Sequence, residues 1–239
     1  MSSGEVFKRV EKKYLLSDAE YRMMLFRLAQ NGMRPDEYGL STISNLYYDT
    51  ADFLLIRRSL EKPVYKEKLR LRAYGAPDES SPAYVEIKKK YKGVVYKRRV
   101  TLPLGLAAES LARGKLPDTL GQIGRELDYF LRMYQPEKKV LLAYDREAFF
   151  LPDDAALRVT FDHGIRYREN RLDLSQGSTG RLLLPDDQHL MELKLSAGMP
   201  LWLAHALGEL GIRQTSYSKY GAYYLQRGNE ATKEGKVSA

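Results

Sequence analysis

Charged and apolar residues alternate along several segments of this chain, as they do in β-strands with one polar and one apolar face. The segment LRLRAY places Arg70 and Arg72 two residues apart, with Leu69 and Leu71 in the opposite phase. Side chains two residues apart share one face of a strand. The same spacing recurs in RVEKKY, YVEIKKKY and VVYKRRV. These segments predict strands with a mostly positive face that also carries a few carboxylates.

The wider pattern predicts strands alternating with helices along the whole chain. Strands are expected at residues 6–14, 42–49, 64–74, 83–92, 94–102, 138–150, 156–163 and 189–196. Helices are expected at residues 19–30, 52–60, 104–113, 118–134, 200–210 and 216–227. Ser17-Asp18 provides a helix N-cap, Lys92-Gly93 marks a hairpin turn, and Pro200 suits the first position of a helix.

The fold class that follows is α+β. We expect one domain over residues 6–227, built on a large antiparallel sheet that is closed or nearly closed. The polar segment 228–239 is expected to be a disordered tail.

The polar faces can be explained in two ways. An antiparallel sheet with one solvated face shows the same alternation. A sheet that packs its apolar face under helices would instead enclose a basic channel, which suits a polyphosphate and its metal. The recurrence over many strands, the excess of arginine and the acids in the same phases favour the channel.

Composition narrows the chemistry. The chain has 239 residues, 44% of them hydrophobic, and a formal net charge of +8, which predicts anionic partners. It has no cysteine, which excludes disulfides, a thiol nucleophile and cysteine-ligated metals. No secretory signal or membrane span is evident, so a cytoplasmic location is expected.

Standard catalytic motifs are also missing. The sequence contains no GxxxxGK[ST] loop, no GxGxxG loop and no GxSxG elbow. Phosphoryl transfer needs mainly positioning and charge stabilisation, which lysine, arginine and a carboxylate-held metal can supply. The later strands add suitable groups, with Tyr144 and Arg146 in one phase and Glu192 and Lys194 in another.

Nine segments in order resemble the vacuolar transporter chaperone (VTC) domain, the polyphosphate polymerase branch of the triphosphate tunnel metalloenzymes. They are RVEKKYLL, NLYYDT, LRLRAYG, VEIKKK, YKRRV, YDREAF, LRVTFD, MELKL and YSKYG. The resemblance covers about residues 7–225. It implies an eight-stranded antiparallel β-barrel enclosing a tunnel. It also implies transfer of the γ-phosphate of ATP onto a growing polyphosphate chain, with Mn²⁺ or Mg²⁺ and release of ADP.

The resemblance also implies residue roles. Lys13 and Lys219 would lie near the transferred phosphate, and Glu192 would ligate the metal. Tyr144 would position a phosphate. Further candidates for metal or water contacts are Glu11, Glu86 and Asp162. The residues expected to line the tunnel and hold the phosphate chain are Arg70, Arg72, Lys88, Lys97, Arg146 and Arg158.

One departure bears on the choice of reaction. Tunnel enzymes of the CYTH branch begin with an ExExK strand, whereas this chain has Arg9-Val10-Glu11-Lys12-Lys13. Loss of the first glutamate weakens a second metal site and favours polymerisation over hydrolysis.

Three functions are therefore compatible with the sequence. The first is a polymerase whose partners are ATP and polyphosphate, pyrophosphate or phosphate. The second is a triphosphatase or nucleotide cyclase on the same barrel. The third is a non-catalytic module that binds polyphosphate or nucleic acid. We expect the first and no nucleic acid partner; a membrane-protein partner cannot be read from this sequence.

Overall fold

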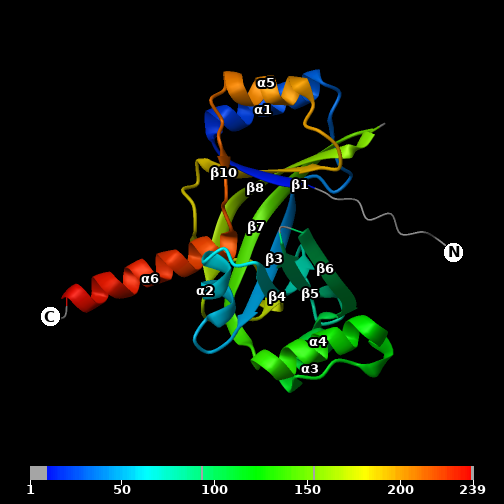
Figure 1. The fold of residues 1–239 in the computed structure, drawn as a ribbon, viewed down its shortest axis with the longest axis vertical. Coiled ribbons are helices and arrows are strands. Elements are labelled where there is room, and N and C mark those ends of the chain that lie inside the picture. Colours follow the sequence, from blue (N-terminus) through cyan, green and yellow to red (C-terminus); the bar gives the residue numbers. More distant parts are fainter. Residues whose placement is uncertain (1–9, 93, 153, 238–239) are drawn as a thin grey trace. The chain divides into compact units, whose positions relative to one another are not determined.

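The computed structural model of the chain describes residues 10–92, 94–152 and 154–237 (Figure 1). The long strands are β1 (Val10–Ser17), β3 (Ser41–Asp49), β4 (Tyr65–Tyr74), β5 (Pro82–Tyr91), β6 (Val94–Pro103), β7 (Glu137–Leu151), β8 (Asp154–Arg168) and β10 (Gln188–Leu195). The two-residue strands are β2 (Arg34–Pro35), β9 (Arg181–Leu182) and β11 (Gln214–Thr215). The helices are α1 (Asp18–Gln30), α2 (Leu54–Leu60), α3 (Leu104–Arg113), α4 (Gly121–Tyr134), α5 (Leu201–Glu209) and α6 (Lys219–Val237), with short 3₁₀ turns η1 (Asp118–Leu120) and η2 (Leu174–Gln176).

The strands pair into one sheet in the order β11-β1-β10-β8-β7-β3-β4-β5-β6, with β2 on β7 and β9 on β8. The expected α+β class with a large antiparallel sheet is confirmed. The expected closed barrel of eight strands is wrong, because the sheet formed by the described residues has eleven strands and two ends, β11 and β6. Local alternation predicts strands but does not fix the tilt and stagger that closure requires. Two-residue strands are too short to show any alternation.

The chain divides into two compact units, which we describe separately. Within the described residues, unit 1 comprises 10–41, 145–152, 154–165 and 184–217. Unit 2 comprises 42–92, 94–144, 166–183 and 218–237.

Unit 1 packs α1 and α5 together against the apolar face of β1 and β10 (Figure 1). The start of α1 is fixed by a capping box, in which Ser17 Oγ accepts from Glu20 N and Glu20 Oε2 accepts from Ser17 N. Its core includes Met24 and Leu28 from α1 and Leu203 from α5, all fully buried. The opposite face of these strands carries Glu11, Lys13, Glu192 and Lys194, together with Leu15 and Leu190.

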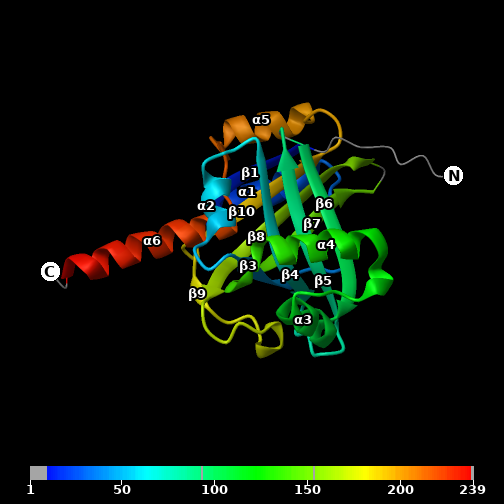
Figure 2. The same cartoon turned by 60° about the horizontal axis from the view of Figure 1, so that its bottom comes forward.

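Unit 2 follows the same principle with different helices. Figure 2 shows α3 and α4 lying over β4, β5 and β6, where residues of the apolar phase such as Leu69, Leu71, Val85 and Ile87 are buried. Because α3 and α4 cover this face, Arg70 and the residues that alternate with the apolar ones lie on the opposite face of the sheet.

Element boundaries agree with the predicted segments apart from a few differences. Pro200 is the N-cap of α5 and not its first residue. Helix α6 runs to Val237, past the expected end at 227. The expected start of the first strand, including Arg9, and Gly93 of the hairpin lie outside the described residues. The limits 6 and 227 of a single domain stay a prediction.

None of the helices in the described part of the chain combines the length and apolar character needed to cross a membrane.

Candidate functional site

One buried acid organises the polar face of unit 2. Glu86, whose side chain is 1% exposed, lies 2.6 Å from Arg70 Nη2, 2.6 Å from Lys97 Nζ and 3.9 Å from Arg99 Nη1. Burial alone would raise the pKa of Glu86, but the charges of Arg70, Arg72 and Lys97 outweigh burial and lower it to about 2. Glu86 is therefore ionised at neutral pH and holds several cations at once.

The cations around Glu86 outnumber it. Register aligns Lys68 with Lys88 and Lys88 with Lys97 in one row across β4, β5 and β6. Like charges directly opposite each other destabilise a sheet. The pKa of Lys97 is lowered, mainly by burial and further by the charges of Arg72 and Arg70. The nearby carboxylate of Glu86 opposes this shift but does not cancel it. This unit 2 cluster is suited to an additional anion.

Strand β3 supplies polar partners that the sequence analysis did not single out. Arg72 Nε donates to Asn45 Oδ1 at 2.8 Å, and Arg72 Nη2 donates to Tyr144 OH at 3.4 Å. Arg70 Nη1 donates to Tyr47 OH at 3.3 Å. The signal was present in STISNLYYD, since Asn45 and Tyr47 share one strand phase.

Lys219 joins this cluster at the first residue of α6. Its side chain is buried, and Nζ lies 4.2 Å from the centroid of the Tyr144 ring. The next residue, Tyr220, donates from its hydroxyl to Asp49 Oδ2 at 2.9 Å. Asp49 also accepts from backbone N–H groups at the start of α2, so a buried carboxylate fixes where α6 begins.

Unit 1 contains a second charged cluster with a different balance. Lys13 Nζ lies 3.0 Å from Glu192 Oε1 and 3.3 Å from Glu11 Oε1. Arg146 holds Asp162 with two bonds of 2.5 and 2.8 Å and reaches Glu192 Oε2 at 3.5 Å. Burial alone would lower the pKa of Lys13, but Glu192 and Glu11 raise it above its usual range. This unit 1 cluster alternates acids and bases.

Two cations lie beside the unit 1 cluster. Burial and the nearby Arg146 lower the pKa of Lys194 to about 8, against the opposing effect of Glu192. Arg158 lies opposite Lys194 in the register, but its half-exposed guanidinium pairs with Asp36 at 2.8 Å. Arg158 therefore has a partner outside the predicted set.

The unit 1 carboxylates include the predicted metal ligands Glu192 and Glu11. No group of three or more histidine, aspartate or glutamate side chains within the described residues is arranged to hold a metal. Glu11 and Glu192 nevertheless both reach the ammonium of Lys13, so two carboxylates converge on one positive charge. Mg²⁺ is commonly held by one or two carboxylates together with substrate phosphates. The donor set fits a hard divalent cation of that kind.

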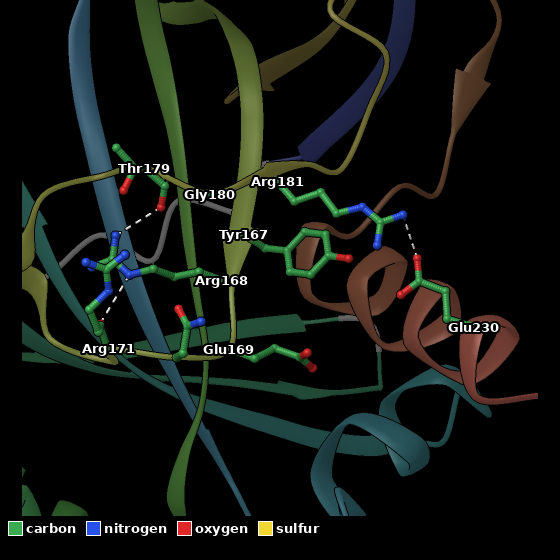
Figure 3. A pocket seen from close by; sticks show the side chains of 9 residues that line it. Tyr167, Arg168, Glu169, Arg171, Thr179, Gly180, Arg181 and Glu230 are labelled. Carbon is green, nitrogen blue, oxygen red and sulfur yellow. Dashed lines mark hydrogen bonds and ion pairs between the residues drawn. The ribbon is translucent and has the colours of Figure 1, made fainter. Parts of the chain in front are cut away.

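A pocket of about 430 Å³ also opens in unit 2, around Tyr167, Arg168 and Arg181 (Figure 3). Arg168 donates to the carbonyls of Gly177 and Thr179 at 2.8 and 3.0 Å and so braces the loop before β9. A Cβ at Gly180 would lie 2.4 Å from Tyr167 O, so the loop needs glycine there. The residues that line this pocket include none of the predicted site residues. Arg168 uses its donors for the carbonyls of the loop.

The structure thus places the predicted residues in two groups, and their roles stay predictions. Unit 1 holds Lys13, Glu11, Glu192, Arg146, Asp162 and Arg158. Unit 2 holds Arg70, Arg72, Lys88, Lys97, Glu86, Tyr144 and Lys219.

Solved structures identify the fold. A protein from Bacillus halodurans assigned as an adenylate cyclase matches with a TM-score of 0.54 and 16% identity, over 88% of this chain and 95% of that one. A Vibrio parahaemolyticus protein with the same assignment matches with a TM-score of 0.51 and 14% identity, over 90% and 97%. A Hippeastrum protein assigned as an adenylyl cyclase, described as having a dominant triphosphatase activity, matches with a TM-score of 0.57 and 15% identity, over 91% and 95%.

These matches show that the chain shares its fold with proteins assigned as adenylate cyclases. The VTC domain model matches residues 8–226. The chain belongs to the VTC domain family. A search of curated proteins finds no match.

Proposed function

We propose that this chain is a metal-dependent polyphosphate polymerase that transfers the γ-phosphate of ATP to the end of a polyphosphate chain and releases ADP. Membership of the VTC family supports this reaction class. The observation that carries the proposal is the cation excess of the unit 2 cluster, where a single buried glutamate faces Arg70, Lys97 and Arg99.

The unit 2 cluster is proposed to bind the phosphates. Arg70 and Arg72 present planar guanidinium groups, which bind phosphate oxygens with two parallel N–H donors. Both are prepositioned, Arg70 by Glu86 and Arg72 by Asn45. Such preorganised donors stabilise developing charge without having to reorganise during the reaction.

Lys219 is proposed to neutralise charge on the transferred phosphoryl group. Its ammonium lies over the Tyr144 ring, so it is held by an aromatic face and by the start of α6.

The unit 1 cluster is proposed to supply the metal ligands, with Glu192 first and Glu11 second. When bound, Mg²⁺ or Mn²⁺ would neutralise phosphate charge. Lys13, which pairs with both carboxylates, is proposed to hold them in place and to contact the transferred phosphate.

The transfer balances without a protein nucleophile. An oxygen of the terminal acceptor phosphate forms a bond to the γ-phosphorus of ATP, and the bond from that phosphorus to the β,γ-bridging oxygen breaks. ADP leaves with the electron pair. The acceptor oxygen is already ionised at neutral pH, so no general base is needed, and positioning and charge stabilisation suffice.

A triphosphatase is the second candidate. One observation favours it, namely the fold shared with the Hippeastrum protein that is described as having a dominant triphosphatase activity. In that reaction, water takes the place of the acceptor phosphate and inorganic phosphate is the product.

The test is to incubate the purified chain with ATP and Mn²⁺ or Mg²⁺, separate the products on a gel stained for polyphosphate and assay ADP in parallel. A polymer ladder with matching ADP, abolished by Lys219→Ala and kept by the exposed control Lys138→Ala, supports the polymerase. Phosphate release without polymer supports the triphosphatase. Absence of turnover with every tested metal contradicts both.

A further inference from the structure

The strand ends and turns formed by residues 62–66, 89–92 and 94–96 of unit 2 make one surface, which we call the sheet tip. Lys92 N donates to Val64 O at 3.0 Å, which ties the two turns together. The register places Tyr65 opposite Tyr91, and Tyr91 opposite Val94. The sheet tip is therefore continuous across β4, β5 and β6.

Apolar and aromatic side chains are exposed throughout the sheet tip. The register places Tyr65, Tyr91, Val94 and Tyr96 on one face of the strands and Val95 on the other, so both faces of the sheet tip expose apolar residues. Single exposed apolar residues are normal, but a group of them on adjacent strands marks an interaction surface. The exposed fractions are 62% for Val64, 45% for Tyr65, 45% for Tyr91, 38% for Val94, 48% for Val95 and 46% for Tyr96.

The same surface is crowded with lysines. Lys66 lies directly opposite Lys90 in the register. Burial lowers the pKa of Lys66, and the nearby charges of Lys90 and Lys62 lower it further. Of the two acids that flank residues 62–66, Glu67 is buried and accepts hydrogen bonds from tyrosine hydroxyls, and Glu61 is exposed beside Lys62. The partner of the sheet tip must carry negative charge.

The aliphatic residues discriminate between anionic partners. Sequence-tolerant nucleic acid sites use aromatic faces for stacking, for which Val64, Val94 and Val95 offer nothing. At a lipid surface, valines enter the acyl boundary, tyrosines lie at headgroup level and lysines attract anionic headgroups.

We propose that the sheet tip docks this chain on an anionic lipid surface. Valines and tyrosines enter the interface, and Lys89, Lys90 and Lys92 contact the headgroups. The proposal rests on the exposed residues of the sheet tip and is independent of the catalytic proposal.

The test is sedimentation of the full chain with vesicles of phosphatidylcholine alone or with about one third phosphatidylserine. Binding is expected only to the phosphatidylserine vesicles and is expected to weaken as salt rises. Lys89→Glu/Lys90→Glu/Lys92→Glu should lower the affinity on the order of a hundredfold, given the usual contribution of a lysine near an anionic surface. Val64→Ser/Val94→Ser/Val95→Ser should lower it severalfold while leaving the charge unchanged.

The matched control is Arg34→Glu/Lys138→Glu/Arg213→Glu, which changes the net charge equally at exposed positions elsewhere. This control should lose much less affinity than the lysine variant of the sheet tip. Tyr96→Trp adds a reporter whose emission should shift to the blue on phosphatidylserine vesicles. Thermal midpoints of all variants should match that of the parent chain.

Several results would overturn the proposal. Equal loss of binding in the sheet-tip variant and the control would show only general charge attraction. Equal binding to both vesicle types, or no binding to either, would contradict an anionic lipid surface. Binding of a single-stranded oligonucleotide at much lower concentration than vesicles, with the same three lysines required, would assign the sheet tip to nucleic acid.

Discussion

The two charged clusters use similar residues in different proportions. In unit 2, Glu86 is shared by Arg70, Lys97 and Arg99. In unit 1, Lys13 is shared by Glu11 and Glu192. In unit 2 several cations share one acid, whereas in unit 1 Glu11, Glu192 and Asp162 are balanced by Lys13, Arg146 and Lys194. The excess of cations in unit 2 suits phosphate, and the two carboxylates that converge on Lys13 in unit 1 suit a metal ion.

The strongest test of this difference is Arg72→Ala. Loss of its guanidinium should lower kcat for ATP on the order of a hundredfold or more, as removal of one preorganised charge donor typically does. Arg72→Lys should be intermediate, because it keeps the charge and loses the two-pronged geometry. The measurement is ADP release at saturating ATP. Full turnover in a folded Arg72→Ala variant would remove this strand from the site.

Glu86→Gln tests whether the unit 2 acid acts as an internal counter-ion. The variant should lose about 3 kcal/mol of stability at pH 7, because Arg70, Lys97 and Arg99 lose their shared buried counter-ion. The folded pKa of about 2 lies below the ordinary 4.5, so Glu86 stabilises the fold above pH 4.5 and loses that effect as pH falls through 2. Urea unfolding should therefore show the gap between parent and variant narrowing towards pH 2.

The control for that experiment is Glu126→Gln, which removes a partly exposed pair with Arg98. Its cost should stay below about 1 kcal/mol. A similar cost in both variants would mean that Glu86 contributes no more than a surface ion pair.

Glu192→Gln tests the other half of the comparison. The metal concentration giving half-maximal activity should rise on the order of tenfold, while the KM for ATP at saturating metal changes less. The measurement is ATP turnover across a titration of Mg²⁺ and of Mn²⁺. An unchanged metal requirement would mean that another residue ligates the metal. A loss of ATP affinity without a metal effect would mean that the unit 1 cluster, like the unit 2 cluster, binds phosphate.

The smallest expected effect is that of Tyr47→Phe. Its hydroxyl accepts from Arg70, so its loss should raise the KM for ATP a fewfold, equivalent to about 1 kcal/mol for one hydrogen bond. Fluorescence or calorimetric titration with a non-hydrolysable ATP analogue would check it. A larger effect than that of Arg72→Ala would mean that the phenol, not the guanidinium, is the main ligand.

Alternation along strands predicted much of the fold and of both clusters. The phase that joins Arg70, Arg72, Glu86 and Lys97 follows from the spacing of two within each strand, and the register then brings the strands together. Helix α1 was predicted by its cap at Ser17 for an equally local reason.

What the sequence could not predict depends on contacts between distant segments. Arg158 shares a strand phase with Asp162 but pairs with Asp36, which is 122 residues away. The open ends of the sheet depend on pairing across the whole chain, which no single strand encodes. Strand spacing says nothing about the place of Lys219, which depends on the bond from Tyr220 to Asp49, 171 residues away, and on the ring of Tyr144.

The shared use of Glu86 has a consequence for turnover. A set of cations with its own internal anion holds an incoming polyanion less tightly than a bare set would, because the two anions compete for the same donors. A polymer that must advance one unit at a time needs binding sites of moderate affinity, since a ligand bound too tightly at each step cannot move on. Under the proposed polymerase function, Glu86 would weaken each contact with the growing chain and so let it advance, besides pairing with Arg70.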